Sequence, residues 1–366
     1  MLVFQTVRAT RFETGEKMKA ARFIGGLVTT VAITACTGAN TASGPPTSAA
    51  DTAKVPLTDM TTDARYLGFA GGLYPGSNAL PSAHEAAGAV AARAVKPVDV
   101  NGIPSASGRY VLLSIGMSNT TQEFCSANAG AACASWSFMG QAAADAAVNQ
   151  TTLAIVNGAR GGQTASAWTS PTSPEYDRIR DTQLASAGLS EQQVQIVWVK
   201  VANAQPTVSL PSASADAYTL VSQMGTIART LKQRYPNLRQ VFFSSRIYAG
   251  YATTALNPEP YAYESGLAVK WVVQAQIDQM KQGSVQNARA GDLNYQTVAP
   301  WIGWGPYLWT RGTLGRTDGL VWTTADVESD GTHPSQSGEQ KVGRLLLDFF
   351  KTSPVAQCWF LAGGAC

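Results

Sequence analysis

Residues 109 to 119 read RYVLLSIGMSN and place an apolar run directly before a short polar stretch. A short apolar run of this kind is typical of a strand that is buried on both faces of a sheet. The serine at its end, Ser118, has two interpretations. It is either a turn or helix-capping residue or a nucleophile held at the edge of the sheet. Residues elsewhere in the sequence distinguish between these two interpretations.

Strand-like and helix-like segments alternate after this first strand. Apolar, β-branched runs are separated by amphipathic segments of helical periodicity, a pattern that predicts an α/β domain with a central parallel sheet and helices on both faces. The predicted strands are 109–116, 151–159, 194–202 and 239–248, and the predicted helices are 135–150, 215–235, 262–281 and 335–351.

Polar motifs follow three of these strands and precede the last helix. Ser118 lies in GMSN, Gly162 in NGARGGQTA and Asn203 in KVANAQP, while Asp330 and His333 lie in DGTHPS. The ligand crevice of a parallel α/β sheet lies at the carboxyl ends of its strands, so we expect these residues to converge there.

This set of residues has the composition of an acyl-transfer site. A serine hydroxyl needs a base within hydrogen-bonding distance and a third group to orient that base. His333 supplies the imidazole, and Asp330 precedes it by three residues. The backbone N–H groups of Ser118 and Gly162 and the amide of Asn203 are candidate donors to the oxyanion. Capping, turn and surface roles are the alternatives for each residue.

The four motifs, in this order, resemble those of the SGNH (GDSL-type) hydrolases, over about residues 109 to 350. The resemblance implies a flavodoxin-like three-layer α/β/α sandwich and a serine esterase that uses Ser118, Asp330 and His333 without a metal or other cofactor. Met117 departs from the pattern because the superfamily usually has aspartate there. The asparagine motif also lacks its usual glycine and second acid.

Aromatic residues suggest the substrate. Tryptophans between glycines in segment 299–327 predict flat apolar walls suited to sugar rings, with core packing as the alternative. We predict deacetylation of a polysaccharide or oligosaccharide. An esterase acting on lipid, phenolic or polyester substrates and a carbohydrate-binding lipoprotein without catalysis are the alternatives. His84 is predicted to be a surface or structural histidine. The predicted substrate-binding residues are Asn119, Trp168, Arg246, Tyr248, Trp301, Trp304 and Trp309.

The N-terminal residues predict export. Basic residues near the start are followed by an apolar run that ends at Cys36. The last four residues of this stretch, ITAC, resemble a lipobox. Residues 1–36 are therefore predicted to be a lipoprotein signal peptide, with a plain secretory signal as the alternative. We expect a flexible linker over 37–60, an N-terminal elaboration over 61–108 and the hydrolase domain over 109–366. The expected location is the bacterial cell envelope or the medium, with a lipid anchor as the only membrane contact.

Charge and cysteine content agree with this interpretation. Removal of residues 1–35 reduces 27 basic and 24 acidic residues to 22 of each. The remaining chain has no net charge and no cluster of Lys and Arg of the kind that nucleic-acid binding requires. The spacing of the cysteines predicts disulfides between Cys125 and Cys133 and between Cys358 and Cys366, with free buried thiols as the alternative. The oligomeric state stays open.

Overall fold

A five-stranded parallel sheet forms the centre of the fold. The computed structural model describes residues 54–127 and 132–364. The sheet has the order β4-β3-β5-β6-β7, which in chain order is 2-1-3-4-5, the flavodoxin-like arrangement. This order confirms the predicted fold class. The strands are β3 (Tyr110–Gly116), β4 (Leu153–Asn157), β5 (Val194–Lys200), β6 (Gln240–Phe243) and β7 (Trp301–Trp304).

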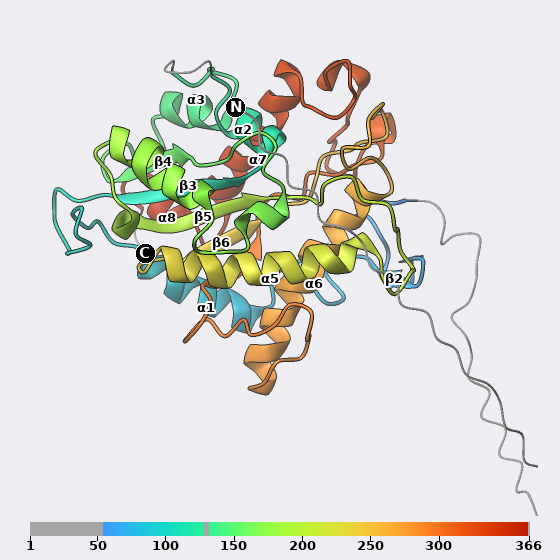
Figure 1. Cartoon of the computed structure of the whole chain (residues 1–366), viewed down its shortest axis with the longest axis horizontal. Coiled ribbons are helices and arrows are strands. Elements are labelled where there is room, and N and C mark those ends of the chain that lie inside the picture. Colours follow the sequence, from blue (N-terminus) through green and yellow to red (C-terminus); the bar gives the residue numbers. More distant parts are fainter. Residues whose placement is uncertain (1–53, 128–131, 365–366) are drawn as a thin grey trace, which may run out of the picture. The chain divides into compact units, whose positions relative to one another are not determined.

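Helices cover both faces of this sheet. Strand side chains alternate between the faces, so Val111 and Leu113 join one apolar cluster while Leu112 joins the other. The first cluster includes α5 (Asp216–Arg234) and α6 (Tyr261–Gln282), and the second includes α7 (Gln336–Thr352). Figure 1 shows α5 and α6 on one side of the strands and α7 on the other. The remaining helices are α1 (Ser82–Arg93), α2 (Ser118–Phe124), α3 (Phe138–Ala144), α4 (Pro174–Arg178) and α8 (Gln357–Phe360).

Local sequence explains where several helices end. Helix α5 stops just before Pro236. Helix α6 ends at Gln282 and is capped by Gly283, whose φ of 76° favours glycine. The helix predicted over 135–150 is much shorter. Asp145 accepts a hydrogen bond from the N–H of Ala147, and Asn149 accepts from two later backbone N–H groups. These side chains compete with helical hydrogen bonds and turn the chain.

The segment before β3 packs on the same core. It contains the hairpin of β1 (Arg65–Tyr66) and β2 (Phe69–Ala70), as well as α1. Leu57 is fully buried, and its N–H donates to the Tyr307 hydroxyl at 3.2 Å. The prediction of a flexible linker up to residue 60 is therefore wrong for its last residues. The signal peptide, Cys36 and most of the predicted linker lie outside the described residues.

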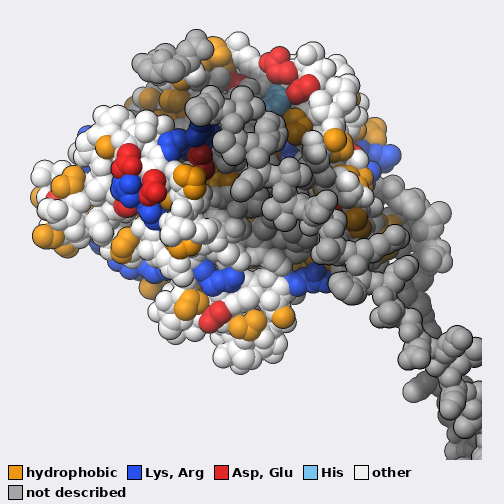
Figure 2. Space-filling view, in the orientation of Figure 1, with side chains coloured by type: hydrophobic (Ala, Val, Ile, Leu, Met, Phe, Trp, Pro, Cys, Tyr) orange, Lys and Arg blue, Asp and Glu red, His pale blue; other side chains and the backbone are white. Residues whose placement is uncertain are grey.

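A disulfide joins Cys125 and Cys133, as predicted. Cys366, the predicted partner of Cys358, lies outside the described residues. On the face that Figure 2 shows, basic side chains lie scattered among acidic and uncharged ones. Within residues 54–127 and 132–364, none of the helices has the length and apolar character that crossing a membrane requires.

Candidate active site

Ser118 is the first residue of α2 and follows directly after β3. Met117 is extended, with φ −104° and ψ −164°, and forms the cap between strand and helix. The turn is tight because Gly116 lies against the neighbouring strand β5: a Cβ at this position would come within 2.3 Å of the Lys200 carbonyl oxygen. The sequence thus places the Ser118 hydroxyl at the carboxyl edge of the sheet and at a helix N-terminus.

His333 lies within hydrogen-bonding distance of this hydroxyl. Its Nε2 is 2.8 Å from Ser118 Oγ, and its Nδ1 is 2.5 Å from Asp330 Oδ2. Since the Asp330 carboxylate accepts from Nδ1–H, the neutral imidazole has Nε2 free to accept the Ser118 proton. The structure therefore joins the three predicted catalytic residues in one chain of hydrogen bonds.

A tight turn holds the aspartate and the histidine in register. Asp330 Oδ1 accepts the backbone N–H groups of Thr332, at 2.8 Å, and His333, at 3.0 Å. Burial acts to raise the pKa of Asp330, but these N–H groups and the His333 side chain outweigh it and hold the pKa below its usual range. Gly331 has a φ of 64°, and a Cβ there would come within 1.9 Å of the Tyr251 carbonyl oxygen. The turn therefore requires glycine at position 331, between the side chains of Asp330 and His333.

The predicted oxyanion donors, Ser118, Gly162 and Asn203, line one pocket. Arg160 N–H donates to the Gly116 carbonyl at 3.1 Å and ties the glycine loop to the end of β3. A Cβ added to Gly161 would be 3.8 Å from Ser118 Cβ. Asn203 follows β5 and donates one amide hydrogen to the Asp216 carbonyl at 2.7 Å. Its second amide hydrogen has no acceptor among the described residues, so it is available to an oxyanion.

The pocket that Ser118, His333, Gly162 and Asn203 line has a volume of about 220 Å³. Asn119, a predicted substrate-binding residue, is part of it, but its amide donates to the Thr332 carbonyl and thus also anchors the histidine loop. Arg246, predicted for the same role, lies there as well. The pocket is lined by Met117, Ser118, Asn119, Gly162, Thr164, Asn203, Ala204, Arg246, Leu256, Asn257, Thr332 and His333.

The prediction that tryptophans line the cleft is wrong. The four tryptophans predicted to bind substrate, at positions 168, 301, 304 and 309, are all buried. The indole N–H of each donates to an acceptor inside the protein, so none presents a face to a ligand. Tyr248, also predicted to bind substrate, is half-buried against Tyr251 and Trp309 and does not line the pocket. The indole partners are Gln163 O for Trp168, His84 O for Trp301, Leu73 O for Trp304 and Glu259 Oε1 for Trp309.

Sequence reasoning missed two features of the site. Asn257 adopts a φ of 61°, is 5% exposed and lines the pocket. Positive φ is uncommon outside glycine, although asparagine tolerates it better than most residues. The second feature is a fully buried ion pair in which Lys200 donates to both carboxylate oxygens of Glu123. The sequence shows both residues, Glu123 in α2 and Lys200 at the end of β5. It does not show that they pair, because their proximity depends on the order of the strands in the sheet.

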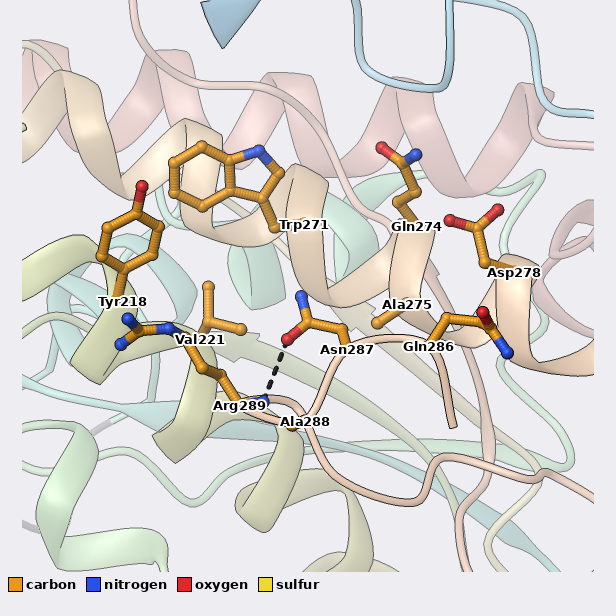
Figure 3. A pocket seen from close by; sticks show the side chains of 10 residues that line it. All are labelled: Tyr218, Val221, Trp271, Gln274, Ala275, Asp278, Gln286, Asn287, Ala288 and Arg289. Atoms are coloured by element: carbon orange, nitrogen blue, oxygen red, sulfur yellow. Dashed lines mark hydrogen bonds between the residues drawn. The ribbon is translucent and has the colours of Figure 1, made fainter. Parts of the chain in front are cut away.

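A second, larger hollow of about 570 Å³ lies over α5 and α6 (Figure 3). Tyr218 stacks on Trp271 with ring centroids 5.3 Å apart, and the Arg289 guanidinium lies 4.4 Å from the Tyr218 ring centroid. None of the ten side chains that line this hollow is a serine, cysteine or histidine. It therefore offers no serine, cysteine or histidine nucleophile and no imidazole base.

No family model matches the sequence, and no curated protein matches it. The fold is similar to several solved structures at low identity. An extracellular lipase from Streptomyces rimosus is 13% identical and aligns over 65% of this chain and 98% of its own, with a TM-score of 0.32. A carbohydrate esterase family 2 enzyme with a carbohydrate-binding domain from Corynascus thermopiles is 13% identical over 69% and 68% of the two chains, with a TM-score of 0.37.

A family 2 carbohydrate esterase from Cellvibrio japonicus is 11% identical over 69% of this chain and 63% of its own, with a TM-score of 0.33.

Proposed function

We propose that this chain is a serine hydrolase of carboxylic esters. The observation that carries the proposal is the continuous hydrogen-bonded chain from Ser118 Oγ through His333 to Asp330. This arrangement is what nucleophilic catalysis by a serine requires, namely a base in contact with the hydroxyl and a carboxylate that orients the base.

The reaction follows from the positions of these groups. Ser118 Oγ attacks the ester carbonyl carbon, and His333 Nε2 takes the hydroxyl proton. The oxyanion accepts hydrogen bonds from the backbone N–H groups of Ser118 and Gly162 and from the Asn203 amide. His333 then returns the proton to the departing alcohol as the carbon–oxygen bond breaks. Water attacks the acyl-enzyme by the same route and releases the carboxylic acid, and Ser118 regains its proton.

The pocket favours a small substrate group. Its volume of about 220 Å³ is below that of pockets that enclose drug-sized ligands, so we propose short acyl esters. Deacetylation of a polysaccharide or oligosaccharide remains a candidate within this class. However, the tryptophans that favoured it are buried and no longer support it. The intact triad geometry counts against a carbohydrate-binding protein that has lost catalysis.

We also propose that the chain is exported. The Cys125–Cys133 disulfide supports an oxidising compartment. Lipid anchoring at Cys36 stays a prediction from the sequence and is tested by mass spectrometry of the mature N-terminus.

The decisive experiment is labelling with a fluorophosphonate probe, combined with turnover of nitrophenyl acetate. We expect the probe to modify Ser118 in the wild-type protein. Ser118→Ala should abolish both labelling and turnover while its thermal melting curve stays that of the wild type. Turnover retained by Ser118→Ala would refute the proposal. Acetate release from acetylated xylan, compared with nitrophenyl esters of increasing chain length, then separates a polysaccharide deacetylase from a lipid esterase.

A further inference from the structure

Arg246 combines deep burial with a guanidinium that has no partner. It follows β6 at the carboxyl edge of the sheet, is 1% exposed and lines the pocket of Ser118. Its Nε, Nη1 and Nη2 atoms have no hydrogen-bond partner among the described residues. Only its backbone is engaged, since its N–H donates to Ser265 Oγ at 3.0 Å. The Arg246 guanidinium, which can donate five hydrogen bonds, therefore donates none within the described residues.

The neighbouring acids do not need this guanidinium. Glu123, Glu259 and Asp330 are close enough to favour its charge, but each already has its own donors. Both oxygens of Glu123 accept from Lys200. Glu259 accepts the Trp309 indole N–H at 2.7 Å and a backbone N–H, and Asp330 is held in the triad turn.

A buried charge without hydrogen bonds destabilises a fold, and proteins rarely retain one without compensation. A guanidinium also presents a planar fork of donors that matches the two oxygens of a carboxylate. Arg246 lines the same pocket as the proposed nucleophile, Ser118. The missing partner of Arg246 is therefore best sought in the substrate.

We propose that Arg246 binds a carboxylate carried by the ester substrate, so that the enzyme selects acidic esters over neutral ones. This inference rests on the proposed function and adds the substrate's charge to it. Two buried acceptors in the same pocket, Asn203 Oδ1 and Asn257 Oδ1, also lack partners. Hydroxyl groups of the substrate or water satisfy these oxygens, whereas the carboxylate is directed to the guanidinium.

The carboxylate has two chemical sources. It belongs either to the acyl group, as in a half-ester of a dicarboxylic acid, or to the alcohol, as in an acylated hydroxy acid or sugar acid. Methyl hydrogen glutarate compared with its amide, methyl glutaramate, tests the acyl source. O-Acetyl lactate compared with O-acetyl lactamide tests the alcohol source. Each pair differs in charge and hardly in size.

The experiment measures kcat/KM for both pairs in the wild type, Arg246→Met and Arg246→Lys. Charge-assisted bidentate hydrogen bonds predict a preference of roughly 10- to 100-fold for the acidic member of one pair. We expect Arg246→Met to abolish that preference and Arg246→Lys to keep part of it. Arg289→Met, which removes a positive charge from the hollow in Figure 3, is the matched control and should keep the wild-type preference.

A binding measurement separates this inference from the proposed function. Calorimetric titration of glutarate into Ser118→Ala needs no turnover, and we expect binding that Ser118→Ala/Arg246→Met loses and that glutaramide does not show. If neutral esters are hydrolysed but neither pair shows a preference and glutarate does not bind, the inference is wrong and the hydrolase proposal stands. If glutarate binds through Arg246 but no ester is hydrolysed, the hydrolase proposal fails and the anion site stands.

Discussion

The chain has two histidines, and the structure gives them opposite surroundings. His84 lies on α1, is 5% exposed and stacks on Trp301 with ring centroids 4.8 Å apart. Its Nε2 donates to the Ile302 carbonyl at 2.8 Å. His333 lies in the loop before α7, is partly exposed, and bridges Asp330 and Ser118.

We infer from this difference that chemical partners, not burial, qualify an imidazole for the proposed catalysis. Burial lowers the pKa of His84 to about 4, outweighing the hydrogen bond to Ile302, which acts to raise it. The strongly lowered pKa therefore does not mark His84 for catalysis, because the hydrogen-bond partner of its ring is a backbone carbonyl and not a hydroxyl or a carboxylate. His333 qualifies because a carboxylate fixes one ring nitrogen and leaves the other facing a hydroxyl.

Replacing each histidine in turn tests this contrast and gives the largest expected change in kcat. We expect His333→Ala to lower kcat by roughly 10⁶-fold, because the base and its orientation are lost together. His84→Gln should leave kcat within a few-fold of the wild type and lower the melting temperature, because it disturbs packing against Trp301. The two measurements are nitrophenyl acetate turnover and thermal unfolding.

Each variant serves as the control for the other. A large loss of kcat in His84→Gln, with the protein still folded, would contradict the assignment of His84 to structure. An unaltered kcat in His333→Ala would contradict the triad.

Asp330→Asn tests what the carboxylate adds to the histidine. The asparagine oxygen can keep the two backbone N–H bonds that Oδ1 accepts. Its NH₂ group then faces His333 Nδ1, which must become the acceptor, so the proton moves to Nε2 and Ser118 loses its base. We expect kcat to fall by roughly 10⁴-fold with the fold preserved.

The matched control for this variant is Asp318→Asn, at an exposed carboxylate paired with Arg316. It should leave kcat unchanged. A loss below tenfold in Asp330→Asn would show that the carboxylate does not select the tautomer.

The fold and the proximity of Ser118, His333 and Asp330 could be predicted from the sequence, because both depend on patterns with fixed structural consequences. Apolar runs alternating with amphipathic helices specify a parallel sheet, and the carboxyl ends of parallel strands share one edge. Ser118, Gly162 and Asn203 each follow such a strand, and the Asp330–His333 spacing closes a turn within one loop. These residues could therefore be brought together before the structure was known.

The substrate side of the site could not be predicted in the same way. The composition of WIGW, residues 301–304, predicts a ligand-binding wall, but the segment forms β7 and buries Trp301 and Trp304 within the fold. Aromatic residues between glycines suit both roles, so composition cannot separate them. Arg246 and Asn119 were predicted from the sequence and do line the pocket. That the Arg246 guanidinium lacks a partner could not be predicted, because this depends on Glu123 pairing with Lys200 across α2 and β5.

The smallest expected effect is a change in the free energy of unfolding with pH that results from the titration of His84. The unfolded chain protonates this histidine near pH 6.5, whereas the folded protein does so only near pH 4. Between these values the unfolded state binds more protons, so the free energy of unfolding falls as the pH falls. The difference of pKa values corresponds to about 3 kcal/mol lost between pH 7 and pH 4.

Denaturant unfolding of the wild type and His84→Gln at pH 7, 5.5 and 4 measures this contribution. Other titrating groups are common to both proteins and cancel in the comparison, so the wild type should lose more stability than the variant across this range. An equal loss in both proteins would show that His84 does not stay neutral in the fold. In that case its surroundings would no longer distinguish it from an exposed imidazole, and the contrast with His333 would rest on the hydroxyl and carboxylate alone.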